Sequence, residues 1–187
     1  MTRSAPTLET ERLTLRAWRK DDFRPYHAIL QEPAVHRHFG PVPIGAEECW
    51  RRLMAGAGGW LLNGFGTWAV ELKGLGDRDE GARLVGNAGL FTAWRDLEPQ
   101  FGDEPEMGWI MASETHGQGL AHEACRAVLD WSETVLEPTP IWAIIAPSNA
   151  ASFKLAERLG FERVGETAYH GELTAVLRRP AWVSSPG

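Results

Sequence analysis

The chain has 187 residues, of which 19 are Lys or Arg and 25 are Asp or Glu, so its formal net charge is −6. A general nucleic-acid-binding protein needs a basic face to neutralise phosphates, and this acidic balance argues against that class. The longest apolar run, residues 141–146, is far shorter than the ~18 residues that span a bilayer. Residues 1–10 carry no apolar secretory signal. The sequence therefore predicts a cytoplasmic protein whose partners include neither nucleic acid nor a membrane.

The two cysteines, Cys49 and Cys125, do not form a C-x-x-C or a zinc-binding spacing. Both fall in helix-like stretches, and Cys125 lies within an apolar stripe. We therefore expect two buried thiols in a reducing compartment, no metal site and no cysteine nucleophile.

The first half of the chain alternates strand patterns with two helix patterns. Apolar and polar residues alternate in the opening segment, which is typical of a half-exposed strand. Later helical stretches begin at cap-forming residues. In chain order the patterns predict a strand at 12–18, helices at 22–31 and 45–62, strands at 66–73 and 82–94, and a polar hairpin loop at 74–79.

The second half contains the longest predicted helix, residues 117–136, whose apolar residues form one wide stripe. The whole order is β-α-α-β-β-β-α-β-α-β-β, which predicts one domain over residues 1–187 with a mixed α/β (or α+β) sheet flanked by helices. Residues 1–8 and 181–187 are expected to be loose tails. The other elements predicted here are an acidic loop at 93–105, strands at 106–112 and 140–146, a helix from Ser148-Asn149 to Gly160, and two strands within 161–179 joined near His170-Gly171.

The segment from Glu106 to Glu123 runs from a predicted strand through a loop with Gly117 and Gly119 into the long helix. Unpaired backbone N–H groups at a helix N-terminus attract anions, and glycines let a bulky anion come close. The pair of glycines also occurs in ordinary structural turns. A Walker loop is excluded because Gly-Lys-Ser/Thr is absent, and a dinucleotide-binding fingerprint because His122 stands where its third glycine would be.

A second motif, Asn149-Ala-Ala-Ser152, opens the next helix. Ser152 shares the face of Leu155 and Ala156, so its hydroxyl points inward and needs a partner. One interpretation is a hydrogen bond to the carbonyl of Ser148 one turn back. The other is a hydroxyl directed into a cleft beside the glycine loop.

Taken together, these motifs resemble the GNAT superfamily of acetyl-CoA-dependent N-acetyltransferases, and the resemblance covers nearly the whole chain. It is similar in particular to the RimJ/RimL branch, which includes enzymes that acetylate the N-termini of ribosomal proteins and enzymes for small amines. The resemblance implies a GNAT-like fold: a mostly antiparallel sheet with one splayed parallel strand pair and about four helices. The motifs that carry it are Leu8-Glu9-Thr10-Glu11-Arg12-Leu13-Thr14-Leu15-Arg16, Glu106-x-Gly108-Trp109, Gly117-Gln-Gly119-Leu-Ala121, Asn149-x-x-Ser152 and Leu159-Gly160-Phe161.

The resemblance implies that acetyl-CoA is the co-substrate. Its phosphates would meet the glycine loop, where His116 replaces the family's usual first residue, and its pantetheine arm would lie between strands 106–112 and 140–146. A backbone N–H near Ile110 would polarise the thioester carbonyl. The implied cofactor-binding residues are Ile110, Met111, Ala112, Gly117, Gln118, Gly119, Leu120, Ala121, Asn149 and Ser152.

For catalysis, many family members use a tyrosine as the acid, but here Ala156 stands at that position. The resemblance makes Ser152 the candidate partner of the departing thiolate, with Asn149 ordering the cofactor or a water. Glu106 is the candidate base, acting through a water. It could instead be a strand-end carboxylate bonded to backbone. Tyr169 and His170 are alternative bases.

The expected function is transfer of an acetyl group to a primary amine by direct attack, with a protein N-terminus or a small amine as acceptor. Acidic residues before Glu106 (Asp96, Glu98, Asp103 and Glu104) could attract a cationic amine or could simply be solvated. The missing tyrosine keeps a second hypothesis open, a non-catalytic acyl-CoA-binding sensor or interaction module. The chain is expected to be a monomer or a homodimer.

Overall fold

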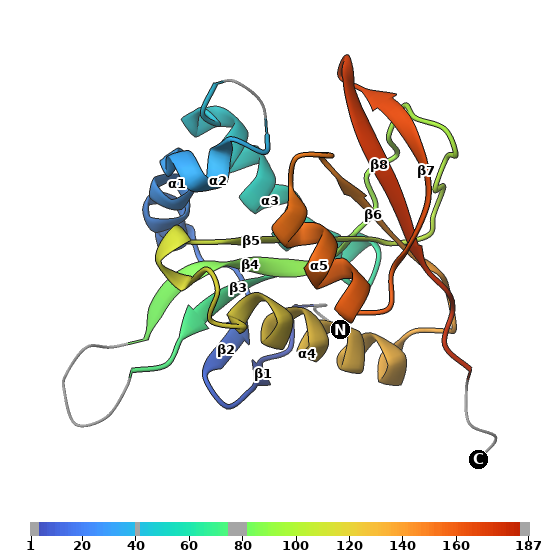
Figure 1. Cartoon of the computed structure of the whole chain (residues 1–187). Coiled ribbons are helices and arrows are strands. Elements are labelled where there is room, and N and C mark those ends of the chain that lie inside the picture. The colour runs from blue at the N-terminus through green and yellow to red at the C-terminus, as the bar shows by residue number, and fades with distance from the viewer. Residues whose placement is uncertain (1–3, 40–41, 75–81, 184–187) are drawn as a thin grey trace.

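A single eight-stranded sheet organises the chain in a computed structural model that describes residues 4–39, 42–74 and 82–183. The strand order is β1-β2-β3-β4-β5-β6-β8-β7, and every neighbouring pair is antiparallel except β5 and β6 (Figure 1). The strands are β1 (Leu8–Glu9), β2 (Leu13–Arg16), β3 (Thr67–Leu72), β4 (Arg83–Phe91), β5 (Glu106–Met111), β6 (Ile141–Ile145), β7 (Glu162–Tyr169) and β8 (Glu172–Arg179).

Helices cover both faces of this sheet. The α-helices are α1 (Phe23–Gln31), α2 (Pro33–His36), α3 (Ala46–Leu62), α4 (Leu120–Val135) and α5 (Ala150–Arg158), and short 3₁₀ turns lie at Lys20–Asp22 and Ser113–Thr115. The larger core cluster joins α4 and α5 to the sheet, and a smaller cluster lies beneath α1, α2 and the start of α3.

Strand β5 contributes to both clusters, and its side chains alternate between them. Met107, Trp109 and Met111 pack with the α4–α5 cluster, whereas Ile110 and Ala112, just after the strand, pack beneath α1. Because side chains of a strand point to opposite faces in turn, Glu106 shares the α1 face with Ile110. The strand therefore presents its acid and its tryptophan on opposite sides of the sheet.

The parallel pair β5–β6 separates soon after it forms. The only registered pair between the two strands is Glu106 with Trp142, next to a hydrogen bond from the Trp142 N–H to the Pro105 carbonyl (2.9 Å). Beyond it, β5 stays paired with β4, while β6 stays paired with β8. The sheet thus opens into a gap along β5, as the family resemblance implied.

The mixed α/β fold with one parallel strand pair is confirmed, and each predicted helix and long strand is present with shifted ends. The short strand β1 and the four-residue α2 were not predicted. The predicted hairpin loop at 74–79 lies outside the described residues except for Gly74. Of the expected tails, residues 1–3 and 184–187 lie outside them too, while Leu8 starts β1 and Trp182 packs against the larger cluster. None of the described helices is long and apolar enough to cross a membrane.

Candidate functional site

The start of α4 has the geometry of an anion-binding turn. Gly117 and Gly119 both adopt left-handed backbone conformations, with φ of 75° and 78°, and Gly119 caps the helix without a side-chain hydrogen bond. A Cβ at Gly117 would meet no atom within 4 Å, and one at Gly119 would meet only Arg12 at 3.7 Å. The turn therefore has room for a bulky group beside the start of α4, where the first N–H groups of a helix have no partner within the helix and can receive phosphate oxygens.

The turn before α4 is held by residues near the N-terminus. Glu123, in the first turn of α4, accepts hydrogen bonds from the Thr10 hydroxyl (2.6 Å) and from Arg12 N–H (2.9 Å) and Nε (2.7 Å). Arg12 also donates to the Gln118 carbonyl at 2.9 Å. Burial opposes ionisation of Glu123, but the hydrogen bonds from Thr10 and Arg12 lower its pKa overall. Arg12 and Glu123 thus brace the glycine turn, a role that the sequence did not reveal.

The edge of β5 that faces the gap offers backbone groups to a ligand. Ala112 N–H donates to the Val85 carbonyl of β4 at 2.8 Å, and antiparallel pairs alternate between bonded and non-bonded. By that alternation the N–H of Ile110 faces β4, while those of Trp109 and Met111 face the gap. The Met111 carbonyl already accepts from His116 Nε2 at 3.0 Å. The resemblance implied that a backbone N–H near Ile110 polarises the thioester carbonyl. The candidates for that N–H are therefore Trp109 and Met111 rather than Ile110 itself.

Ser152 lies across the gap from β5, at the start of α5. Its backbone N–H donates to Asn149 Oδ1 (3.1 Å), so Asn149 is the N-cap that the sequence predicted. The Ser152 hydroxyl accepts from Trp109 Nε1 at 3.3 Å, and no bond to the Ser148 carbonyl is formed among the described residues. An indole N–H can only donate, so the hydroxyl proton of Ser152 stays available for another acceptor.

Glu106, the candidate base, is buried and paired with a residue that the sequence did not single out. Arg95 donates to both carboxylate oxygens, from Nε at 2.6 Å and from Nη2 at 2.9 Å, and from Nη1 to the Tyr169 hydroxyl at 2.6 Å. Glu106 is only 3% exposed. Burial raises its pKa, and Arg95 partly offsets that rise. The carboxylate is therefore held by a side chain rather than by neighbouring backbone.

Three other sequence expectations concern this region. Ala156 is fully buried on the inward face of α5, so the family's tyrosine position points into the protein here without a hydroxyl. Cys49 and Cys125 are buried free thiols as predicted, and burial raises the pKa of Cys49 to about 11. His170 is exposed and its ring lies 4.1 Å from that of Tyr169.

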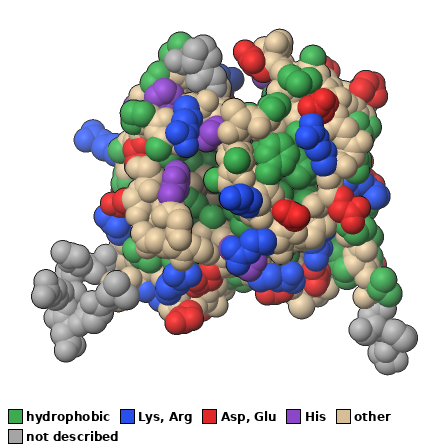
Figure 2. Space-filling model, viewed as in Figure 1, with side chains coloured by type: hydrophobic (Ala, Val, Ile, Leu, Met, Phe, Trp, Pro, Cys, Tyr) green, Lys and Arg blue, Asp and Glu red, His purple; other side chains and the backbone are tan. Residues whose placement is uncertain are grey.

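The acidic loop before Glu106 is only partly solvated. Asp96, Glu98 and Asp103 are exposed, but Glu104 accepts a hydrogen bond from Trp142 Nε1 at 2.5 Å. Among the residues that the structure describes, no group of three or more His, Cys, Asp or Glu side chains could hold a metal ion. Figure 2 shows a central hollow with hydrophobic side chains in it and with basic and histidine side chains around it.

A family model described as an acetyltransferase (GNAT) domain matches residues 12–162, which is most of the chain. The chain therefore belongs to the GNAT acetyltransferase family. Among solved structures, a protein from Bordetella pertussis described as a GNAT-family acetyltransferase is 30% identical. It superposes with a TM-score of 0.78 over 94% of this chain and 99% of its own.

Two proteins of Bacillus subtilis (strain 168) are also similar. The uncharacterized N-acetyltransferase YoaA is 24% identical over 163 residues, which are 86% of this chain and 85% of YoaA. The uncharacterized protein YkkB is 31% identical over 97 residues, 52% of this chain and 51% of YkkB, so the match spans about half of that relative. Family membership and YoaA together support an N-acetyltransferase enzyme.

Proposed function

We propose that the chain transfers the acetyl group of acetyl-CoA to the primary amine of a small molecule or of a protein N-terminus, by direct attack of the amine on the thioester. The observation that carries this proposal is the placement of two groups on either side of the opened sheet. Glu106 lies on the α1 face of β5, and Ser152 lies on the α4–α5 face, bonded to Trp109. The proton acceptor thus lies where the gap begins and the proton donor lies beside the gap, on opposite faces of the sheet.

The cofactor side of the proposal uses backbone groups. The N–H groups of residues 119–121 would receive the phosphates, and the gap-facing edge of Trp109 and Met111 would pair with the amides of the pantetheine arm, as an added strand does. The left-handed glycines and the open space above them fit a bulky anion. The aminoglycoside acetyltransferase AAC(6')-Ib has a similar fold, with a TM-score of 0.68 and 17% sequence identity to this chain. Its structure was solved in complex with acetyl-CoA.

The chemistry follows from the two faces. Glu106 takes a proton from the attacking amine through a water, while the nitrogen–carbon bond forms and the carbon–sulfur bond breaks. A gap-facing N–H of β5 stabilises the charge on the carbonyl oxygen. The Ser152 hydroxyl donates a hydrogen bond to the departing thiolate, and Asn149 holds the first turn of α5 that carries this hydroxyl.

For the acceptor we propose the range of the RimJ/RimL branch, protein N-termini and small amines. A fold neighbour from Vibrio fischeri is a ribosomal-protein-S5-alanine acetyltransferase, with a TM-score of 0.71 and 19% identity. The hollow in Figure 2 is open to solvent on the face shown, which suits an extended N-terminus as well as a small amine.

The test is thermal unfolding with acetyl-CoA, CoA and NADH, each titrated separately. A ligand at a hundredfold excess over its Kd stabilises the native state by about 2.7 kcal/mol. We expect stabilisation by both CoA species and none by NADH, followed by thiol release with an amine acceptor. Stabilisation without thiol release from any amine would favour the non-catalytic acyl-CoA-binding module. No stabilisation by either CoA species would refute the assignment of the glycine turn.

A further inference from the structure

Arg95, Glu106 and Tyr169 form one cluster from three distant parts of the chain. Arg95 belongs to the loop between β4 and β5, Glu106 begins β5, and Tyr169 ends β7. The guanidinium donates from all three nitrogens, two to Glu106 and one to Tyr169. It also lies over the Tyr169 ring, 4.9 Å from the centroid. Such a fork fixes a carboxylate in one orientation.

The residue before Arg95 has an unusual backbone conformation. Trp94 is in the left-handed region with φ of 45°, where a bulky residue rarely lies, and its own side chain is exposed. Strain of this kind persists only where the surroundings determine the conformation, and it gathers at functional sites. The hydrogen bonds of Arg95 hold the residue that directly follows Trp94.

The fork leaves Glu106 usable as a base. A carboxylate has about four lone-pair positions, and Arg95 occupies two of them, one on each oxygen. The remaining positions can accept a proton from a bound water. The fork therefore orients Glu106 and still leaves lone-pair positions free on both of its oxygens.

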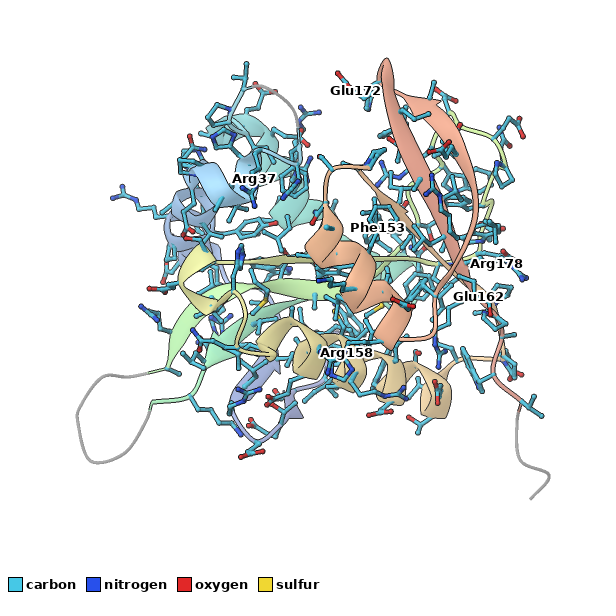
Figure 3. All side chains as sticks on the ribbon, in the orientation of Figure 1. Arg37, Phe153, Arg158, Glu162, Glu172 and Arg178 are labelled. Carbon is cyan, nitrogen blue, oxygen red and sulfur yellow. The ribbon has the colours of Figure 1, made fainter. Side chains whose placement is uncertain are left out.

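The third bond of Arg95 ties the β7–β8 hairpin to the site. Tyr169 pairs with Glu172, and Figure 3 shows Glu172 at the outer end of the hairpin, with Glu162 and Arg178 at its base. The first five residues of β7, 162–166, are exposed, so the sheet covers little of this strand. The Arg95–Tyr169 bond thus fastens the hairpin near its free end.

We propose that Arg95 is the positioning residue of this site: it orients Glu106 as the base and, through Tyr169, fastens the β7–β8 hairpin as a wall of the acceptor side. The inference rests on the proposed acetyl transfer, since it names what prepares the base of that reaction. All three guanidinium nitrogens of Arg95 are engaged by Glu106 and Tyr169, so Arg95 acts on the reaction through these two residues.

The charges around Glu106 define the expected pH behaviour. Arg95 is the cation in contact with it, and Tyr169 is the neighbouring hydroxyl. Trp142 and Arg178 lie in register with Glu106 across β6 and β8, so they share its face of the sheet, and Glu104 and Arg178 both contact the Trp142 ring system. Burial raises the pKa of Glu106 and Arg95 offsets part of that rise, so loss of Arg95 raises this pKa further. Since the base must be ionised, the acidic limb of kcat/KM then moves to higher pH.

The experiment compares Arg95→Gln, Arg95→Lys and Tyr169→Phe with the control Arg163→Gln, which removes an exposed arginine paired with Glu166 on the same hairpin. We expect Arg95→Gln to shift the acidic limb upward by about one pH unit or more. Arg95→Lys keeps the positive charge but not the paired hydrogen bonds to both oxygens of Glu106. It should therefore shift the acidic limb of kcat/KM less than Arg95→Gln does, while still lowering kcat. Tyr169→Phe should leave the limb in place, and the control should match the wild type.

Hydrogen exchange gives a readout that does not depend on activity. Amides of residues 167–173 should exchange faster in Arg95→Gln and in Tyr169→Phe than in the control. The inference would be overturned if the acidic limb of the kcat/KM profile of Arg95→Gln matched that of the wild type and if amides 167–173 exchanged at wild-type rates in both Arg95→Gln and Tyr169→Phe. If the wild type itself transfers acetyl to no amine, the proposed function fails instead, and the exchange data still decide whether Arg95 fastens the hairpin.

Discussion

Gly119→Glu is the substitution that tests the phosphate turn most directly. Gly119 has φ of 78° and ψ of 0°, a conformation that costs a non-glycine residue roughly 1–2 kcal/mol. A side chain there has room, because its Cβ would meet only Arg12 at 3.7 Å. The variant should therefore fold, with reduced stability, and should place a carboxylate where we expect the pyrophosphate.

The expected loss of affinity follows from the charge. Two unit charges about 4 Å apart near a protein surface repel by about 4 kcal/mol, which corresponds to roughly a thousandfold in Kd. Arg12 is close enough to pair with the new carboxylate and so to reduce its repulsion of the pyrophosphate. We therefore expect the Kd for CoA to rise between about tenfold and a thousandfold relative to Gly119→Gln, which has the same strain and nearly the same bulk without the charge.

Calorimetric titration of CoA into both variants measures this difference, and far-ultraviolet circular dichroism confirms that each is folded. A higher salt concentration should reduce the difference in Kd for CoA between the two variants, since salt screens exposed charges. Equal affinities of the folded Glu and Gln variants would refute the placement of the pyrophosphate at this turn.

Three further predictions test the surroundings. Ser152→Ala removes the hydroxyl that accepts from Trp109 and should lower kcat at least about tenfold while the Kd for acetyl-CoA changes little; a wild-type kcat in thiol release would contradict the role of Ser152. Glu123→Gln should destabilise the fold at pH 7, and, because the pKa of Glu123 is lowered in the native state, the difference from the wild type should shrink as pH falls from about 5 toward 3; a difference independent of pH in denaturant unfolding would contradict this. Asp22→Asn breaks the buried pair with Arg16 (2.7 and 2.8 Å) and should lower the free energy of unfolding by about 3 kcal/mol, whereas a loss below about 1 kcal/mol would show that Glu71 alone satisfies Arg16.

Local signals in the sequence predicted much of the fold and part of the site. As predicted, Asn149 caps α5, Gly117 and Gly119 lie in the turn before α4, and residues 106–112 contain a strand. Each of these depends on residues a few positions apart, where periodicity and capping rules apply. The roles assigned to these residues in binding and catalysis remain predictions.

What the sequence missed depends on contacts between distant residues. Arg12 meets Glu123 across 111 positions, Trp109 meets Ser152 across 43, and Arg95 meets Tyr169 across 74. Nothing in the spacing of these residues marks them as partners. A positive charge in an acidic loop, such as Arg95 next to Asp96, is usually solvated. Only the packing of β4, β5 and β7 shows that this arginine turns inward.

The positions of Glu106 and Trp109 on opposite faces of the sheet could be predicted only in part from the sequence. Their separation of three residues already puts them on opposite faces of any regular strand, because side chains alternate with a period of two. The sequence alone does not say which helices cover which face, and that decides which side holds the base. In the structure α1 covers the side of Glu106, and α5 brings Ser152 to the side of Trp109. A slip of β5 by one residue against β4 would exchange the faces, so pairs such as Phe91 with Glu106 fix the direction of the proposed reaction as well as the sheet.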